Sequence, residues 1–289
     1  MSSERHLSHS QNFFKDPELV KKLVEKQTSI RETDIVLDIG AGKGIIAEAL
    51  IFTGCQVIAI EKDPRLAQEL RARFGLESRM QIWQGDFLNY PLEDLPPNYQ
   101  VFANPPFNFT TDIIRRLTES FSPPQNAYLI VQKEAAERFM GLPREGLASL
   151  RIKPWFDLGV HHHFQRQDFE PTPSVDPVLL KMLKRKSPLV TKDNRSKYLD
   201  FIAFVFSQWQ PNLKRALGSV FTNRQFNRLS QNLKISTQAK PTEVSFEQYL
   251  RMFDLLRQGI GNQKAIENAN EKTERQQENL QKDYRTRSR

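Results

Sequence analysis

The chain has 289 residues, of which 38% are hydrophobic and 26% charged, and this length suits one large domain or two modest ones. Its single cysteine, Cys55, excludes an intramolecular disulfide, and no run approaches the roughly 20 apolar residues of a membrane-spanning helix. Because the first residues also lack the apolar run of a secretory signal, we expect a cytoplasmic protein without a membrane partner.

Short apolar runs alternate with helical patterns through the first 180 residues. Strands are predicted at 35–39, 56–60, 80–83, 100–103 and 127–131, and helices from Pro17 onward and at 44–52, 64–74 and 111–120. Two further strand candidates, 155–160 and 178–183, are expected to form a hairpin-like edge around a proline-containing loop. The alternation predicts an α/β fold, a Rossmann-like parallel sheet with helices on both faces.

The pattern changes after a polar linker at 184–194. Helices are predicted at 198–209, 211–217, 223–233 and 246–257, which together make a small all-helical domain. From Gly261 onward there are almost no apolar residues to offset the entropy of ordering. We therefore divide the chain into an α/β domain at 1–186, a helical domain at 187–260 and a polar, disordered tail at 261–289.

The positive charge lies in the last third of the chain. Residues 1–180 carry 20 basic and 24 acidic side chains, whereas residues 181–289 carry 22 and 10. A basic module joined to a nearly neutral one favours binding to a polyanion, and nucleic acid is favoured over an acidic membrane. The alternative is that the charges only keep a helical surface soluble. The candidates for phosphate contacts are Lys214, Arg215, Arg224 and Arg228.

A glycine-rich loop, Asp38-Ile39-Gly40-Ala41-Gly42-Lys43-Gly44, follows the first predicted strand and opens a helix. Glycines allow a sharp turn and a close approach of backbone to ligand. The loop is not a phosphate-binding P-loop, because Gly44 stands where that motif has Ser or Thr. Its third glycine also comes one residue too early for the dinucleotide motif.

Two acidic residues end the next two predicted strands. Glu61 lies 21 positions after Gly40 and can accept both hydroxyls of a ribose, and Asp86 can accept from the amino group of an adenine. Because ligands of open α/β sheets bind at the carboxyl ends of the strands, we expect these groups along one edge. The set suits an adenosine cofactor without a pyrophosphate, so we predict S-adenosylmethionine (SAM).

Asn104-Pro105-Pro106-Phe107 follows the fourth predicted strand. Two prolines remove two backbone donors and stiffen the turn, which holds its carbonyl groups in fixed directions. The Asn104 side-chain oxygen and the Pro105 carbonyl can then accept both hydrogens of an exocyclic amine and direct its lone pair at a methyl donor. Phe107 can stack on the base. The pattern favours methylation of an adenine amino group.

These motifs occur with Ser10-Gln11-Asn12-Phe13-Phe14 and Phe169-Glu170-Pro171-Thr172-Pro173-Ser174-Val175 in an order that resembles the rRNA adenine N6-methyltransferases over residues 8–260. Within that family the chain looks most like the Erm enzymes. The resemblance implies a SAM-dependent Rossmann-like domain followed by a helical domain. It also implies dimethylation of one adenine in 23S rRNA, with resistance to macrolides, lincosamides and streptogramin B.

The resemblance also assigns residues. Asn12 and Phe14 are expected to line the cofactor site, which the motif residues Gly40, Gly42, Glu61, Asp86 and Asn104 complete. Catalysis is assigned to Asn104, Pro105, Phe107 and Phe169, with the two phenylalanines positioning an adenine that has left its stack.

Several alternatives stay open. The family usually has Asn-Ile-Pro-Tyr or Asn-Leu-Pro-Tyr, and the form Asn-Pro-Pro-Phe suits amino-methyltransferases more broadly, including enzymes of tRNA or DNA. A KsgA-type enzyme of 16S rRNA and a non-catalytic RNA-binding factor on the same fold are the other candidates. We expect no metal, because the adjacent histidines His161, His162 and His163 alternate in direction on a strand, and we expect a monomer.

Overall fold

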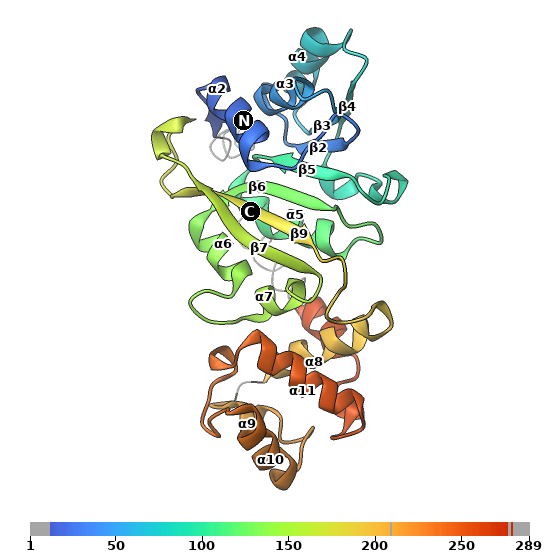
Figure 1. Ribbon diagram of the computed structural model, residues 1–289, viewed down its shortest axis with the longest axis vertical. Helices are drawn as coiled ribbons and strands as arrows, with labels where there is room; N and C mark the ends of the chain where they lie inside the picture. The colour runs from blue at the N-terminus through green and yellow to red at the C-terminus, as the bar shows by residue number, and fades with distance from the viewer. Residues whose placement is uncertain (1–11, 209, 277–278, 280–289) are drawn as a thin grey trace. The chain divides into compact units, whose positions relative to one another are not determined.

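The computed structural model describes residues 12–208, 210–276 and 279. The chain divides into two compact units, one formed by Met1–Ala136 with Phe156–Arg185 and the other by Glu137–Trp155 with Lys186–Arg289. The first unit is built around a sheet, and the second is helical (Figure 1). This confirms the predicted fold class.

A seven-stranded sheet forms the first unit, in the order β4-β3-β2-β5-β6-β9-β7. The first five strands in this order, β4, β3, β2, β5 and β6, are parallel to one another. Strand β9 is antiparallel to both β6 and β7. The strands span Ile35–Ile39 (β2), Gln56–Glu61 (β3), Met80–Gln84 (β4), Gln100–Ala103 (β5), Asn126–Gln132 (β6), Phe156–His163 (β7) and Pro177–Lys184 (β9). The predicted edge hairpin is present. Its later strand, β9, pairs with β6, and its earlier strand, β7, forms the edge of the sheet.

The strand order reverses direction at β2. From β2 the chain moves outward through β3 to β4, and it then returns to the other side of β2 as β5. The loops after β2 and β5 therefore leave the same edge of the sheet as neighbours. The glycine loop begins after β2 and the Asn-Pro-Pro turn after β5, so the topology brings the two motifs together.

Helices α2 (Pro17–Gln27), α3 (Ile45–Ile51) and α4 (Pro64–Phe74) pack on one face of the sheet (Figure 1). Their apolar side chains meet alternate strand residues such as Val36, Val57 and Phe102. The intervening residues Leu37 and Val101 are equally buried, which is typical of parallel strands covered on both faces. Helix α5 (Thr110–Glu119) follows β5, and α6 (Lys133–Met140) follows β6.

A two-stranded sheet that the sequence analysis did not predict joins β1 (Phe13–Phe14) to β8 (Phe169–Glu170). β8 lies in the loop between β7 and β9, so the start of the described chain is paired with a segment from far along the sequence. The Lys15 amide continues this attachment by donating to the Asp168 carbonyl at 2.9 Å.

The second unit consists of short helices around aromatic side chains. They are α7 (Leu147–Ile152), α8 (Arg195–Ser207), α9 (Leu213–Ala216), α10 (Asn223–Leu233) and α11 (Phe246–Arg257). Tyr198 and Phe201 of α8 pack against Phe253 of α11, with ring centroids 5.2 and 6.1 Å apart. Predicted helix residue Trp209 lies outside the described residues.

The unit boundaries differ from the predicted domains. Residues 137–155 belong with the helical unit, because Tyr198 donates to the Leu150 carbonyl at 3.1 Å and Trp155 donates to the Val190 carbonyl at 2.9 Å. Such long-range hydrogen bonds leave no local pattern in the sequence.

The stretch after Gly261 also differs from the predicted polar, disordered tail. Gln263–Ile266 forms a 3₁₀ helix, residues 269–276 are helical, and Ile266 is buried. The Asn270 amide donates to the Asp200 carboxylate at 2.9 Å. The predicted tail residues 277–278 and 280–289 lie outside the described residues, and among the described helices none is long and apolar enough to span a membrane.

Gly44 tests the packing of α3 against α4. Its φ is +80°, and an added Cβ would lie 2.7 Å from both Leu70 and Phe74. Gly44→Ala is expected to lower the free energy of unfolding by about 2–4 kcal/mol, the sum of left-handed strain and overpacking. The matched control is Gly259→Ala, whose φ is +89° and whose added Cβ would meet nothing within 4 Å.

For the control we expect a loss of only about 1–2 kcal/mol, the strain alone. Urea unfolding of the two variants measures the difference. Equal losses would contradict the packing explanation.

Candidate active site

A cavity of about 820 Å³ opens at the carboxyl ends of β2, β3, β4 and β5 in the first unit. One segment from each strand end lines it, and Asn12, Phe13 and Phe14 form a further wall. The predicted site residues that line the cavity are Asn12, Phe14, Gly40, Glu61, Asp86, Asn104 and Pro105. The structure therefore brings together most of the predicted set.

The glycine loop has left-handed backbone at three positions, with φ of +74° at Gly40, +56° at Gly42 and +80° at Gly44. The Gly40 amide donates to the Ile60 carbonyl at 2.8 Å, which ties the loop to β3. A Cβ on Gly42 would lie 2.7 Å from the Phe13 ring, so glycine is needed there for close packing against β1. Gly42 supports the cavity without lining it.

Glu61 is buried and accepts two backbone hydrogen bonds. The Gly42 amide donates to its Oε2 and the Asp63 amide to its Oε1, each at 2.8 Å. Each carboxylate oxygen has a second lone pair, so Glu61 can still accept ribose hydroxyls. The same bonds hold the glycine loop to the start of α4, a structural duty that the sequence analysis did not foresee.

Asp86 lies half-buried at the end of the loop after β4. Lys62 forms an ion pair with its Oδ2 at 2.8 Å, and the Leu88 amide donates to its Oδ1 at 3.0 Å. Burial acts to raise the pKa of Asp86, but these two hydrogen bonds outweigh burial and hold the pKa below its usual range. Asp86 is therefore an ionised acceptor at neutral pH.

Asp38, which the sequence analysis did not assign, is fully buried in β2 beneath the loop. Burial, followed by the nearby charge of Glu61, raises its pKa well above the ordinary value. Burial therefore disfavours the charged form of Asp38. A carboxyl within an otherwise apolar strand was the signal that could have drawn attention to it.

The Asn-Pro-Pro turn presents two acceptors. Asn104 donates from Nδ2 to the Asn12 carbonyl at 2.6 Å, which leaves its Oδ1 without a donor among the described residues. The Pro106 carbonyl accepts from the Phe109 amide at 2.9 Å, whereas no residue that the structure describes donates to the Pro105 carbonyl. The turn lies against the glycine loop, with Pro106 Cδ 3.6 Å from an ideal Cβ on Gly40.

The aromatic residues are arranged differently from the prediction. Phe169 is fully buried, with its ring centroid 4.6 Å from that of Phe14 and 5.4 Å from that of Phe164, and it does not line the cavity. Phe107 packs against the same core cluster. Phe169 therefore presents no open ring face in this structure, and the positioning of an adenine that was assigned to the two phenylalanines stays a prediction.

Other aromatic residues line the cavity instead, namely Phe13, Phe87 and Phe109. Phe109 follows the Asn-Pro-Pro turn within the 3₁₀ helix Phe107–Phe109. Phe109 lies only three residues after Pro106 in the sequence, and one helical turn brings such a residue back beside the turn. This spacing could have predicted that Phe109 lines the cavity.

Comparison with known proteins decides the family. The model of a family described as ribosomal RNA adenine dimethylase matches residues 2–258. The chain belongs to the ribosomal RNA adenine dimethylase family. It is similar to an rRNA adenine N-6-methyltransferase of Bacteroides fragilis, with 30% identity over 244 residues that cover 84% of this chain and 90% of the relative.

A ribosomal RNA small subunit methyltransferase A of Synechococcus sp. is 28% identical over 257 residues, covering 85% of this chain and 91% of the relative. Among solved structures, 23S rRNA methyltransferase ErmE superposes with a TM-score of 0.75 at 24% identity, covering 85% of this chain and all of that one. A dimethyladenosine transferase from Plasmodium falciparum gives 0.69 at 20% identity, covering 86% and 99%. Both structures have the same fold.

Membership of the dimethylase family confirms the predicted resemblance, the enzyme class and SAM as the cofactor. The hydrogen-bond acceptors of the cavity fit that cofactor, since buried Glu61 retains free lone pairs and Asp86 is a second, ionised acceptor. The roles of the individual residues stay predictions.

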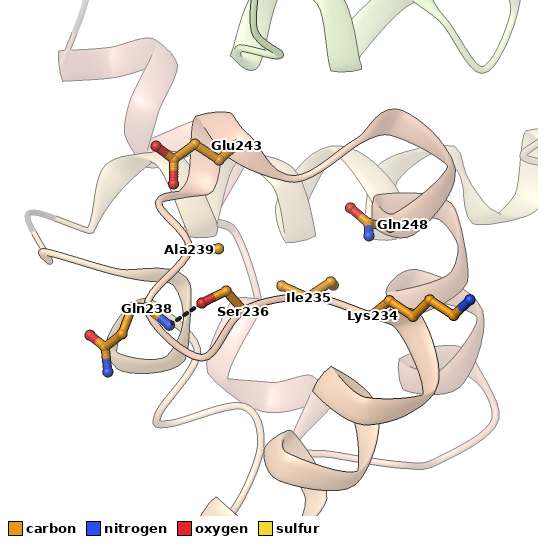
Figure 2. A pocket seen from close by; sticks show the side chains of 7 residues that line it. All are labelled: Lys234, Ile235, Ser236, Gln238, Ala239, Glu243 and Gln248. Atoms are coloured by element: carbon orange, nitrogen blue, oxygen red, sulfur yellow. Dashed lines mark hydrogen bonds between the residues drawn. The ribbon is translucent and has the colours of Figure 1, made fainter.

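A smaller hollow of about 370 Å³ lies in the helical unit of this dimethylase. Figure 2 shows the charged ends of Lys234 and Glu243 pointing in opposite directions. Gln248 caps α11, Glu243 accepts a backbone amide, and Ser236 accepts from the Gln238 amide. These polar groups are used in local turns, so the hollow has few free hydrogen-bonding groups for a ligand. Within the described residues no three His, Cys, Asp or Glu side chains form a metal site.

Glu61→Gln tests the carboxylate of the cofactor site. The amide replaces one accepting oxygen by a donor, which then faces the Gly42 or Asp63 amide. Loss of one charged hydrogen bond, about 1.5–3 kcal/mol, is expected to raise the Kd for SAM by about 10- to 100-fold in isothermal titration calorimetry. The control is Glu69→Gln, an exposed residue at the cavity rim. A similar Kd for both variants would remove Glu61 from the site.

Proposed function

We propose that the protein uses SAM to dimethylate the N6 atom of a specific adenine in 23S rRNA and thereby confers resistance to macrolides, lincosamides and streptogramin B. The observation that carries the chemistry is the pair of free acceptors, Asn104 Oδ1 and the Pro105 carbonyl, at the wall of the cavity. They match the two hydrogens of an adenine amino group.

The amino nitrogen of adenine is a poor nucleophile, because its lone pair is delocalised into the ring. Accepting both of its hydrogens orients that lone pair and stabilises the positive charge that grows on nitrogen during transfer. SAM supplies the methyl group when bound. The proton leaves only after the amine becomes cationic, so Asn104 needs no basic partner. Proline on both sides of the Pro105 carbonyl limits its movement.

The large-subunit target is supported by two resemblances. The ordered motifs look most like those of the Erm enzymes, and the fold matches 23S rRNA methyltransferase ErmE over all of that chain. A second candidate, dimethylation of 16S rRNA, is favoured by relatives named ribosomal RNA small subunit methyltransferase A at 28 to 30% identity.

The helical unit supplies a surface for the RNA backbone. The sequence from 201 to 242 contains no Asp or Glu and six basic residues. Helix α10 buries Phe226 and Leu229 and exposes Arg224 and Arg228 on its other side. Lys214 of α9 donates to Asn227 of α10 at 3.2 Å, which adds a third cation to this exposed face. Exposed cations in a stretch of sequence without acidic residues suit phosphates.

Asn104→Ala removes one acceptor of the target amine. The Kd for SAM is expected to change by less than about threefold, while kcat falls by about 10²- to 10³-fold, the usual cost of one lost transition-state hydrogen bond. Asn108→Ala, at an exposed position in the same segment, is the control. Methyl transfer is measured with labelled SAM, and unchanged turnover of the Asn104 variant would refute the assigned role.

The target itself is identified by incubating the enzyme with labelled SAM and separately purified 23S and 16S rRNA. We expect label in 23S rRNA only, at one adenine that carries two methyl groups. Expression in a macrolide-sensitive strain is expected to raise the inhibitory concentration of all three drug classes. Label confined to 16S rRNA would favour the second candidate.

The double variant Arg224→Ala, Arg228→Ala tests the docking surface. Each phosphate contact contributes about 0.7–0.9 to the slope of log K against log salt, so losing both is expected to reduce the slope by about 1.4–1.8. The control is Arg257→Ala on α11, whose guanidinium is paired with Asp254. Filter binding with rRNA measures both slopes, and an equal slope for the two proteins would reject this surface.

A further inference from the structure

The side-chain amide of Asn104 is held in one orientation by the backbone of another segment. Its partner, the Asn12 carbonyl, can only accept, so the group facing it at 2.6 Å has to be the Nδ2 amine. The oxygen of the amide is thereby turned away from Asn12. A catalytic acceptor that could rotate by half a turn would otherwise present a donor to the substrate amine half of the time.

The segment that carries the Asn12 carbonyl is itself fixed. Phe13 and Phe14 pair with Glu170 and Phe169 in the β1–β8 sheet, and the Lys15 amide donates to the Asp168 carbonyl at 2.9 Å.

Packing reinforces this pairing from both sides. The Phe14 ring packs against both Phe164 and Phe169, with centroid distances of 5.6 and 4.6 Å. The Phe13 ring fills the space above Gly42. Strand pairing and packing together hold the position of Asn12.

We propose that strand β1 is a positioning element for methyl transfer, which acts through the Asn12 carbonyl to keep the Asn104 oxygen directed at the substrate amine. This rests on the proposed function, since it assigns a source for the orientation that the mechanism needs. It also gives the buried Phe169 a role without contact to the base, because Phe169 anchors the strand.

Asn104→Asp tests the proposal through its pH dependence. The ionised carboxylate of this variant cannot donate to the Asn12 carbonyl and is repelled by it, whereas the protonated acid donates from one oxygen and leaves the other free to accept. The ratio of variant to wild-type kcat, at saturating SAM and rRNA, is therefore expected to rise as the pH falls from 8.5 to 5.5. Above the pKa of the new acid the rise is about tenfold per pH unit, as its protonated fraction grows.

A ratio that stays constant with pH, whether high or vanishing, would overturn the proposal. Wild-type turnover in the same experiment separates this outcome from failure of the proposed function, which would appear as a wild-type enzyme that transfers no methyl group to rRNA. Circular dichroism at both ends of the pH range verifies that the variant is folded.

A second pair of variants changes the strand without touching the cavity. Lys15→Pro removes the amide that donates to Asp168, and Lys15→Ala removes the exposed side chain but keeps the amide. The proline variant is expected to have a kcat about 10- to 100-fold below that of the alanine variant, the cost of a small misplacement of a catalytic group. Equal kcat values for the two folded proteins would show that the attachment of β1 does not matter for catalysis.

Discussion

The site depends on the adjacency of β2 and β5 at the centre of the sheet. Because the chain turns back at β2, the loops that follow these strands share one edge, and the glycine loop lies against the Asn-Pro-Pro turn. In the proposed function, one loop faces the cofactor and the other carries the acceptors for the substrate amine. Strand order brings these two loops together, and any change in that order would separate them.

The polar groups of the cavity have structural and chemical roles at once. Glu61 ties the glycine loop to the start of α4 through two backbone amides while it retains lone pairs for the cofactor. Asn104 donates from its amine to the N-terminal segment, which leaves its oxygen free for the proposed contact with the substrate. A charged acceptor that already receives two hydrogen bonds needs little reorganisation on binding, which is how a preorganised site lowers a barrier.

Local patterns in the sequence predicted most of the sheet unit. The strands at 35–39, 56–61 and 100–103, the glycine loop and the acidic strand ends are each encoded by consecutive residues, so they could be recognised directly. The pairing of Phe14 with Phe169 could not, because two strands of two residues have no periodicity and their partners lie far apart in the chain. For the same reason the burial of Phe169 in the core could not be predicted.

The helical unit is assembled from two separated stretches of chain, and this affects how the protein is made. Residues 137–155 leave the ribosome before β7 and β9, yet the Leu150 carbonyl is paired with Tyr198 and the Trp155 indole with Val190, both in the segment that begins at 186. During synthesis the early stretch has to wait, with its apolar side chains uncovered, until the later helices emerge. A nascent chain stopped after residue 185 would therefore expose the apolar side chains of residues 137–155 to solvent. For the same reason the helical unit cannot be exchanged between relatives by replacing the C-terminal segment alone.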